Sequence, residues 1–128
     1  MLIRYKSNQE KIAMGLLSFM PEEKDVKVLQ ETMSSYKNKE NWHLYLLKES
    51  DDFVGAIGVR LTDDMTAVIQ HISVNPSFRK KGKARKMIQE ISLMYKKDYK
   101  LCSNEDTFEL INKCNNMINY ELADKTRP

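Results

Sequence analysis

The sequence predicts a single α/β domain built on a mixed, mostly antiparallel sheet that is flanked by helices. Residues 41–48, 53–61 and 67–74 are rich in apolar and β-branched side chains and are separated by short polar turns, which predicts successive antiparallel strands. In residues 84–95 the apolar positions recur at the spacing of one helix face. Because a strand followed by this helix can lead into a parallel neighbour near Tyr99, we expect the sheet to be mixed.

The part of the chain before these strands predicts one short strand and two helices. Residues 2–6 form the strand, and the first helix starts near Gln9. Pro21 ends this helix and opens the second, whose positive N-terminus suits the acidic residues that follow, and Lys37 and Lys39 close it. The residues expected to face inward from the two helices are Ile12, Leu16, Phe19, Met20, Val26, Leu29, Met33 and Tyr36.

The remaining elements are predicted from turn residues and shorter apolar runs. The polar residues 49–52 are expected to form a solvated hairpin loop. Residues 99–102 predict a strand, after which a last helix begins at Ser103 or Asn104. The residues expected to face inward from this helix are Phe108, Ile111 and Cys114.

Length and composition predict one domain over residues 1–122, with a frayed tail at 123–128. Residues 117–122 predict one further strand, so the sheet ends in a shortened C-terminal part. No apolar run approaches the roughly 18 residues of a membrane span, so we expect a cytoplasmic protein without membrane contact. Two cysteines without a paired C-x-x-C motif, and two histidines, predict no metal site.

The positive charge is concentrated in one segment. The net charge is +3, and six of the 21 lysines and arginines lie within residues 79–86. Such a local concentration favours a small anionic ligand over nucleic acid as the partner. Gly82 lets the backbone approach a ligand closely, and the helix that follows offers unpaired N–H groups. The segment therefore predicts a pyrophosphate site.

The same segment resembles the acetyl-CoA loop of the GNAT superfamily of N-acetyltransferases. Residues 79–84 read R-K-K-G-K-A and match the family pattern Q/R-x-x-G-x-G/A. They follow I-S-V-N-P at residues 72–76, which is similar to the end of the family's fourth strand, and V-G-A-I-G at residues 54–58 is similar to its third. The segments MLIRYK, KIAMGLLSFMP, VGAIGV and HISVNPSFR further resemble the small GNAT proteins encoded in bacterial riboflavin operons.

This resemblance implies a GNAT fold and a set of residues that bind acetyl-CoA or CoA. The main chain of Ile72, Ser73 and Val74 would pair with the pantetheine arm like an added strand, and an N–H near Val74 would face the thioester oxygen. The residues expected to surround the pyrophosphate are Arg79, Lys80, Lys81, Gly82, Lys83 and Ala84. Asn104 corresponds to the family's asparagine that bonds the pantetheine.

The sequence departs from the family at the positions that carry proton transfer. Family members often have Glu or His where this chain has Val68 and Gln70, and the usual tyrosine acid falls on Ile111. His71 is the substitute base to consider, but simple strand alternation directs it away from Gln70, which favours a packed or hydrogen-bonded histidine. Gln70 remains a candidate for positioning water or substrate.

Two functions therefore stay open. The first is transfer of an acetyl group from acetyl-CoA to the amine of a small molecule or protein. The second is a CoA-binding protein with little turnover that acts by interaction or regulation, with a link to riboflavin metabolism. A homodimer is compatible with either function.

Overall fold

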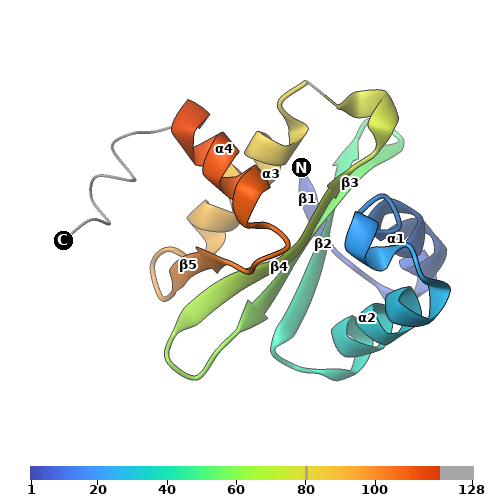
Figure 1. Cartoon of the computed structure of the whole chain (residues 1–128), viewed down its shortest axis with the longest axis horizontal. Coiled ribbons are helices and arrows are strands. Elements are labelled where there is room, and N and C mark those ends of the chain that lie inside the picture. Colours follow the sequence, from blue (N-terminus) through green and yellow to red (C-terminus); the bar gives the residue numbers. More distant parts are fainter. Residues whose placement is uncertain (80, 119–128) are drawn as a thin grey trace.

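The computed structural model describes residues 1–79 and 81–118, and within them five strands form one sheet (Figure 1). The strands are β1 (Leu2–Arg4), β2 (Trp42–Glu49), β3 (Asp52–Leu61), β4 (Thr66–Val74) and β5 (Lys100–Ser103), and they lie side by side in this order. β1 to β4 pair antiparallel, and β4 pairs with β5 in parallel. The predicted mixed, mostly antiparallel sheet is confirmed.

Two pairs of helices cover the two faces of the sheet (Figure 1). One face carries α1 (Glu10–Leu17) and α2 (Val26–Asn38), and the other carries α3 (Lys83–Tyr95) and α4 (Phe108–Ile118). Three short 3-10 turns precede α1, α2 and α3, namely η1 (Ser7–Gln9), η2 (Pro21–Glu23) and η3 (Pro76–Phe78). None of the helices described is both long and apolar enough to span a membrane.

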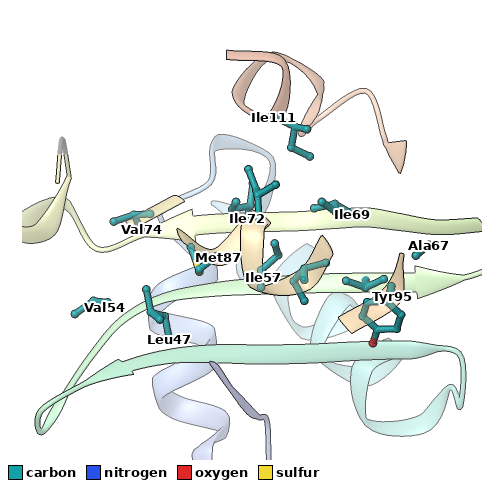
Figure 2. Close-up of a cluster of buried hydrophobic side chains, with 13 residues drawn as sticks. Leu47, Val54, Ile57, Ala67, Ile69, Ile72, Val74, Met87, Tyr95 and Ile111 are labelled. Atoms are coloured by element: carbon teal, nitrogen blue, oxygen red, sulfur yellow. The ribbon is translucent and has the colours of Figure 1, made fainter. Parts of the chain in front are cut away.

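The larger hydrophobic core lies between the sheet and α3 and α4. Figure 2 shows Met87 of α3 close to Ile57 and Ile72 of the sheet, with Tyr95 farther along α3, and Ile111 of α4 belongs to the same buried cluster. Met87 and Ile57 are fully buried. This close packing holds the N-terminal end of α3 at a fixed place beside the end of β4.

The second N-terminal helix begins later than predicted, and three side chains of the two N-terminal helices that were predicted to face inward are exposed. Pro21 opens only the short turn η2, and α2 begins at Val26 because the Asp25 carboxylate accepts the Lys27 N–H as its N-cap. Val26 is consequently 63% exposed, so its predicted inward position is wrong. Ile12 and Phe19 are also exposed, because α1 buries the stripe of Ala13, Leu16 and Leu17 instead. The other inward predictions for these helices, Leu16, Met20, Leu29, Met33 and Tyr36, are confirmed.

The C-terminal helix starts later than predicted and ends later. Ser103 closes β5, and Asn104 forms reciprocal side-chain bonds with Thr107 before α4 begins at Phe108. Phe108 is 56% exposed, against prediction, whereas Ile111 is buried as predicted. Because α4 continues to Ile118, a strand from residue 117 is wrong at its start. The structure does not describe the rest of that predicted strand, the predicted tail at 123–128, or the side chain of Cys114.

Candidate functional site

β4 and β5 separate halfway along β4 and leave part of β4 with one neighbour. Their parallel pairing ends at Ile69 and Ser103. The Thr107 hydroxyl then donates to the Ile69 carbonyl (2.8 Å), and the Asn104 amide donates to the Gln70 carbonyl (3.1 Å). Within the described residues, the last part of β4 therefore pairs with β3 only, and its other edge has no strand beside it.

A cleft of about 780 Å³ lies along this open edge of β4. Ile72, Ser73 and Val74 form its floor, and the turn between α1 and η2 with the start of η2, the loop into α3, and α4 with the turn before it form its walls. The volume is in the range of sites that hold a cofactor or a small molecule. Phe19 lines this cleft, which explains why an apolar residue of that size stays 39% exposed.

The basic segment places backbone donors and cations at one end of the cleft. Gly82 is the N-cap of α3 in the left-handed conformation (φ 74°), and a Cβ built there would meet nothing within 4 Å. The first N–H groups of α3 have no partner within the helix and carry its positive dipole end. Arg79, Lys83 and Arg85 also line the cleft. The segment that the sequence predicts to bind an anion therefore supplies both backbone donors and cations at this end of the cleft.

The sequence-predicted binding residues are brought together in part. Arg79, Gly82, Lys83 and Ala84 line the cleft with the three β4 residues of its floor. Lys81 does not line it and lies over the Phe78 ring, 6.0 Å from its centroid. Asn104 does not line it either, because both ends of its amide are bonded within the β5–α4 loop. Lys80 lies outside the described residues.

One acidic residue that the sequence assigned to a solvated loop contacts this basic end. The Glu49 carboxylate receives the Lys83 ammonium at 2.5 Å and the Lys86 ammonium at 3.0 Å. These two hydrogen bonds lower the pKa of Glu49 to about 2. The prediction was wrong for Glu49 because nothing in the local sequence indicates that the β2–β3 hairpin ends beside the start of α3.

His71 lies in a buried chain of polar side chains on the α2 side of the sheet. The Tyr36 hydroxyl is 2.5 Å from its Nδ1, and Glu23 Oε2 is 3.6 Å from its Nε2. Burial and the nearby Glu23 charge raise the pKa of Tyr36 well above its ordinary value, so the phenol keeps its proton. In the His71 tautomer that carries its proton on Nε2, the phenol donates to Nδ1 and the ring proton points at Glu23. All three residues are buried.

Glu23 is held as a carboxylate by these neighbours. Burial works to raise its pKa, but contacts with His71 and Thr32 outweigh burial, and the pKa of Glu23 is lowered. Its other oxygen, Oε1, is buried and has no hydrogen-bond partner among the described residues. Glu22, the preceding residue, lines the cleft.

A β-bulge changes the alternation of β4 next to His71. Ile69 pairs with Val59 and His71 pairs with Gly58, so Gln70 is the extra residue. The Arg60 side chain, on the face opposite Val59, donates to Gln70 Oε1 at 3.2 Å. Gln70 and His71 therefore share a face, and the predicted opposition between them is wrong. Neither side chain lines the cleft, and His71 is hydrogen-bonded as expected.

No group of three or more histidine, cysteine, aspartate or glutamate side chains that could hold a metal occurs in the described part of the chain. The charged side chains that line the cleft are the cations Arg79, Lys83, Arg85 and Lys113 and the carboxylates Glu22 and Asp106.

Comparison with known proteins agrees with this geometry. Residues 7–106 match the family described as "Acetyltransferase (GNAT) family". A Bacillus methanolicus protein called "Uncharacterized N-acetyltransferase in lysA 3'region" is 50% identical over 114 residues, which cover 89% of this chain and 94% of that protein.

Solved structures with low identity share the fold. Aminoglycoside N-acetyltransferase AAC(6')-Iy in complex with CoA has a TM-score of 0.73 at 12% identity, over 94% of this chain and 87% of that one. A GNAT family acetyltransferase from Elizabethkingia anophelis with acetyl-CoA bound has a TM-score of 0.67 at 19% identity, over 88% of this chain and 71% of that one.

Proposed function

Because this chain belongs to the acetyltransferase (GNAT) family, we propose that it transfers an acetyl group from acetyl-CoA to an amine in the cleft beside β4. One observation carries the proposal. The open edge of β4, over Ile72–Val74, and the basic N-terminus of α3 lie in the same cleft. An extended chain can pair with the first while a pyrophosphate occupies the second.

The two ends of the cleft give the bound cosubstrate a direction. In the proposed complex the pyrophosphate contacts the amides from Gly82 onward, and the pantetheine arm runs along β4 from Val74 towards Ile72. Arg79 already donates to the Val74 carbonyl at 3.1 Å, so its guanidinium lies where these two parts would meet. The acetyl group would then reach the point where β4 and β5 separate, next to the bulge at Gln70.

The reaction requires an uncharged amine. A lysine-like amine has a pKa of about 10.4 and must lose one proton before its nitrogen attacks the thioester carbon. The C–N bond forms, the C–S bond breaks, and the second proton from nitrogen goes to the departing thiolate. In our proposal Glu22 and Asp106 attract the ammonium form of the amine to the cleft. His71 lies on the other face of β4 and influences the site only through its contact with Glu23. Gln70 stabilises the β-bulge through its hydrogen bond with Arg60.

CoA binding is the first test. Saturating CoA, at about a hundred times its Kd, should stabilise the fold by about 2.7 kcal/mol in thermal denaturation. Lys83→Gln should weaken binding by calorimetry, whereas Lys81→Gln removes the same charge from a residue outside the cleft and should change it little. If wild-type protein binds no CoA, or if the two variants behave alike, the proposed site is wrong.

Acetyl transfer is the second test. Thiol release from acetyl-CoA should become faster with at least one amine in a panel of amino acids, polyamines, amino sugars, flavin precursors and lysine peptides. The product, an acetylated amine with a mass increase of one acetyl group, should appear at the same rate as the thiol.

A second candidate is a CoA-binding protein with little turnover. One observation favours it, because Ile111, at the usual place of the tyrosine acid, is buried in the core and cannot donate a proton. This candidate predicts CoA binding without thiol release across the whole panel. It has less support than the enzyme, since the family matched is one of acetyltransferases.

The identity of the acceptor belongs to the same proposal. We retain the riboflavin-operon group of small acetyltransferases, known as RibT, as the subgroup, with a cytoplasmic location and a homodimer as accompanying proposals. Flavin precursors in the acceptor panel test the first. Light scattering at several protein concentrations tests the dimer.

A further inference from the structure

We propose that Glu49 is a built-in competitor of CoA: it holds the Lys83 ammonium in the free protein and gives it up to the cosubstrate's phosphates, so that Glu49 limits CoA affinity and speeds CoA release. The inference rests on the proposed CoA site. It assigns a function to a residue outside the cleft and on a different element from the basic segment.

The contact joins two parts of the chain that are far apart in sequence. Glu49 closes β2 at the hairpin, where it pairs with Asp52, and a register shift between Leu47 and Lys48 precedes it. Lys83 is the first residue of α3, 34 positions later, and it lines the cleft. Both side chains are largely withdrawn from solvent, with 19% of Lys83 and 25% of Glu49 exposed. The contact is therefore better shielded than an ordinary surface pair.

Lys86 makes the arrangement asymmetric. It binds the second oxygen of the same carboxylate, but it is 47% exposed and does not line the cleft. When a phosphate takes Lys83, Lys86 can continue to neutralise Glu49. The carboxylate therefore keeps one partner in both states, and Lys83 can move between two anions without leaving a charge unpaired.

The charges decide the direction of the effect. Glu49 and the two lysines together carry one positive charge, whereas the lysines alone carry two. A pyrophosphate at the start of α3 is attracted by Lys83 and repelled by the Glu49 carboxylate. Replacing Glu49 by glutamine removes the repulsion and leaves Lys83 free, so it should tighten CoA binding. If the pair instead served only to orient Lys83, the same replacement would weaken binding.

The hairpin contains a matched control. Asp51 lies two residues from Glu49, is exposed, and has no ion pair among the described residues. Asp51→Asn therefore removes the same charge from the same hairpin without touching Lys83. A general effect of net charge would appear in both variants, and an effect through Lys83 only in Glu49→Gln.

Calorimetric titration of the full chain with CoA tests the proposal in the wild type, Glu49→Gln, Asp51→Asn, Lys83→Gln and the double variant Glu49→Gln/Lys83→Gln. At low salt, Glu49→Gln should lower the Kd by about three- to tenfold, and the gain should shrink at high salt. Asp51→Asn should stay within about twofold of wild type. In the Lys83→Gln background, Glu49→Gln should give a clearly smaller gain, because only the direct repulsion between the Glu49 carboxylate and the phosphates is then removed.

Release kinetics supply the second readout. Stopped-flow dissociation of CoA should be slower in Glu49→Gln by about the factor by which the Kd falls. An unchanged or weaker affinity in Glu49→Gln, or an equal gain in the Lys83→Gln background, overturns the role of Glu49 and leaves the CoA site standing. A wild-type chain that binds no CoA overturns the proposed function, and this inference with it.

Discussion

Replacing Gly58 by alanine should destabilise the fold strongly, because Tyr36 occupies the space that a side chain would need. A Cβ at Gly58 would overlap the Tyr36 hydroxyl and ring, and even ring atom Cε1 would lie at 2.8 Å. Carbon atoms in contact normally lie about 3.5–4.0 Å apart. The Tyr36 ring cannot easily withdraw, since it is 7% exposed and packs edge-on against Trp42 with ring centroids 5.2 Å apart.

Two terms set the size of the effect. Forcing an extra methyl group into a packed core typically costs about 1–3 kcal/mol. Displacing the Tyr36 hydroxyl also leaves the buried His71 Nδ1 without its partner, for about 1–3 kcal/mol more. The sum, about 2–6 kcal/mol, is a large part of the 5–15 kcal/mol that typically stabilises a domain.

Urea denaturation followed by circular dichroism measures this effect, with Gly15→Ala as the control. Gly15 lies inside α1, and a Cβ there would meet nothing within 4 Å. Gly15→Ala should therefore stabilise by about 0.5–1 kcal/mol. If Gly58→Ala unfolded within 1 kcal/mol of wild type, Tyr36 would not be held as described, and the geometry of the His71 chain would have to be revised.

Three further predictions concern the cleft, the buried carboxylate and the core. Gly82→Glu should abolish CoA binding in calorimetry, because the new carboxylate would occupy the open space where the phosphates are proposed to bind. Gly82→Asn is the control, since asparagine tolerates the left-handed conformation and should keep most of the stability. Equal CoA affinities in the two variants would contradict the prediction. The pKa of Glu23 in the folded protein is lowered, so its contribution to stability is present above the ordinary value of 4.5 and is lost as the pH falls through the folded pKa. Glu23→Gln should therefore make the free energy of unfolding less dependent on pH in that acid range. Parallel curves of unfolding free energy against pH for the wild type and the variant would refute the prediction. Met87→Ala should lower the free energy of unfolding by about 2–5 kcal/mol in urea denaturation, since the Met87 side chain is fully buried between α3 and the sheet. A loss below 1 kcal/mol would show that the neighbouring side chains close in and fill the cavity.

Periodicity predicted most of the fold because the sheet and α3 have strong, long patterns. It failed where a capping side chain sets the start of a helix, or where the position of a residue in the tertiary structure determines whether its side chain is buried. Asp25 starts α2 through its side chain, which leaves Val26 outside the core. Phe19 follows the apolar pattern of α1 but lines the cleft instead of the core. Phe108 lies at the first turn of α4, before the helix reaches the sheet face where Ile111 is buried.

The site was predictable only where its residues are consecutive. The stretch from Ile72 to Ala84 carries its own signal, a strand end followed by a basic glycine loop. Glu49 lies 34 residues before Lys83 in the sequence and contacts it at this end of the cleft. No local sequence pattern indicates that contact. The bulge at Gln70 was also invisible, because it depends on how β4 aligns with β3. A single extra residue there changed the face expected for His71.

The order of the strands has a consequence for how the chain folds. Each strand of the sheet lies beside its neighbour in sequence, and β2, β3 and β4 follow one another with only short turns between them. Contacts between close segments need little loop closure, so this three-stranded meander should form first, with β1 and β5 joining later across their intervening helices. Mutational analysis of folding rates should therefore give high φ-values at Ile57 and low ones at Leu2 and Leu101, and the reverse order would contradict this. The open edge that would receive the pantetheine arm belongs to the last strand of this early unit, and the walls of the cleft are then completed around it by α3 and α4.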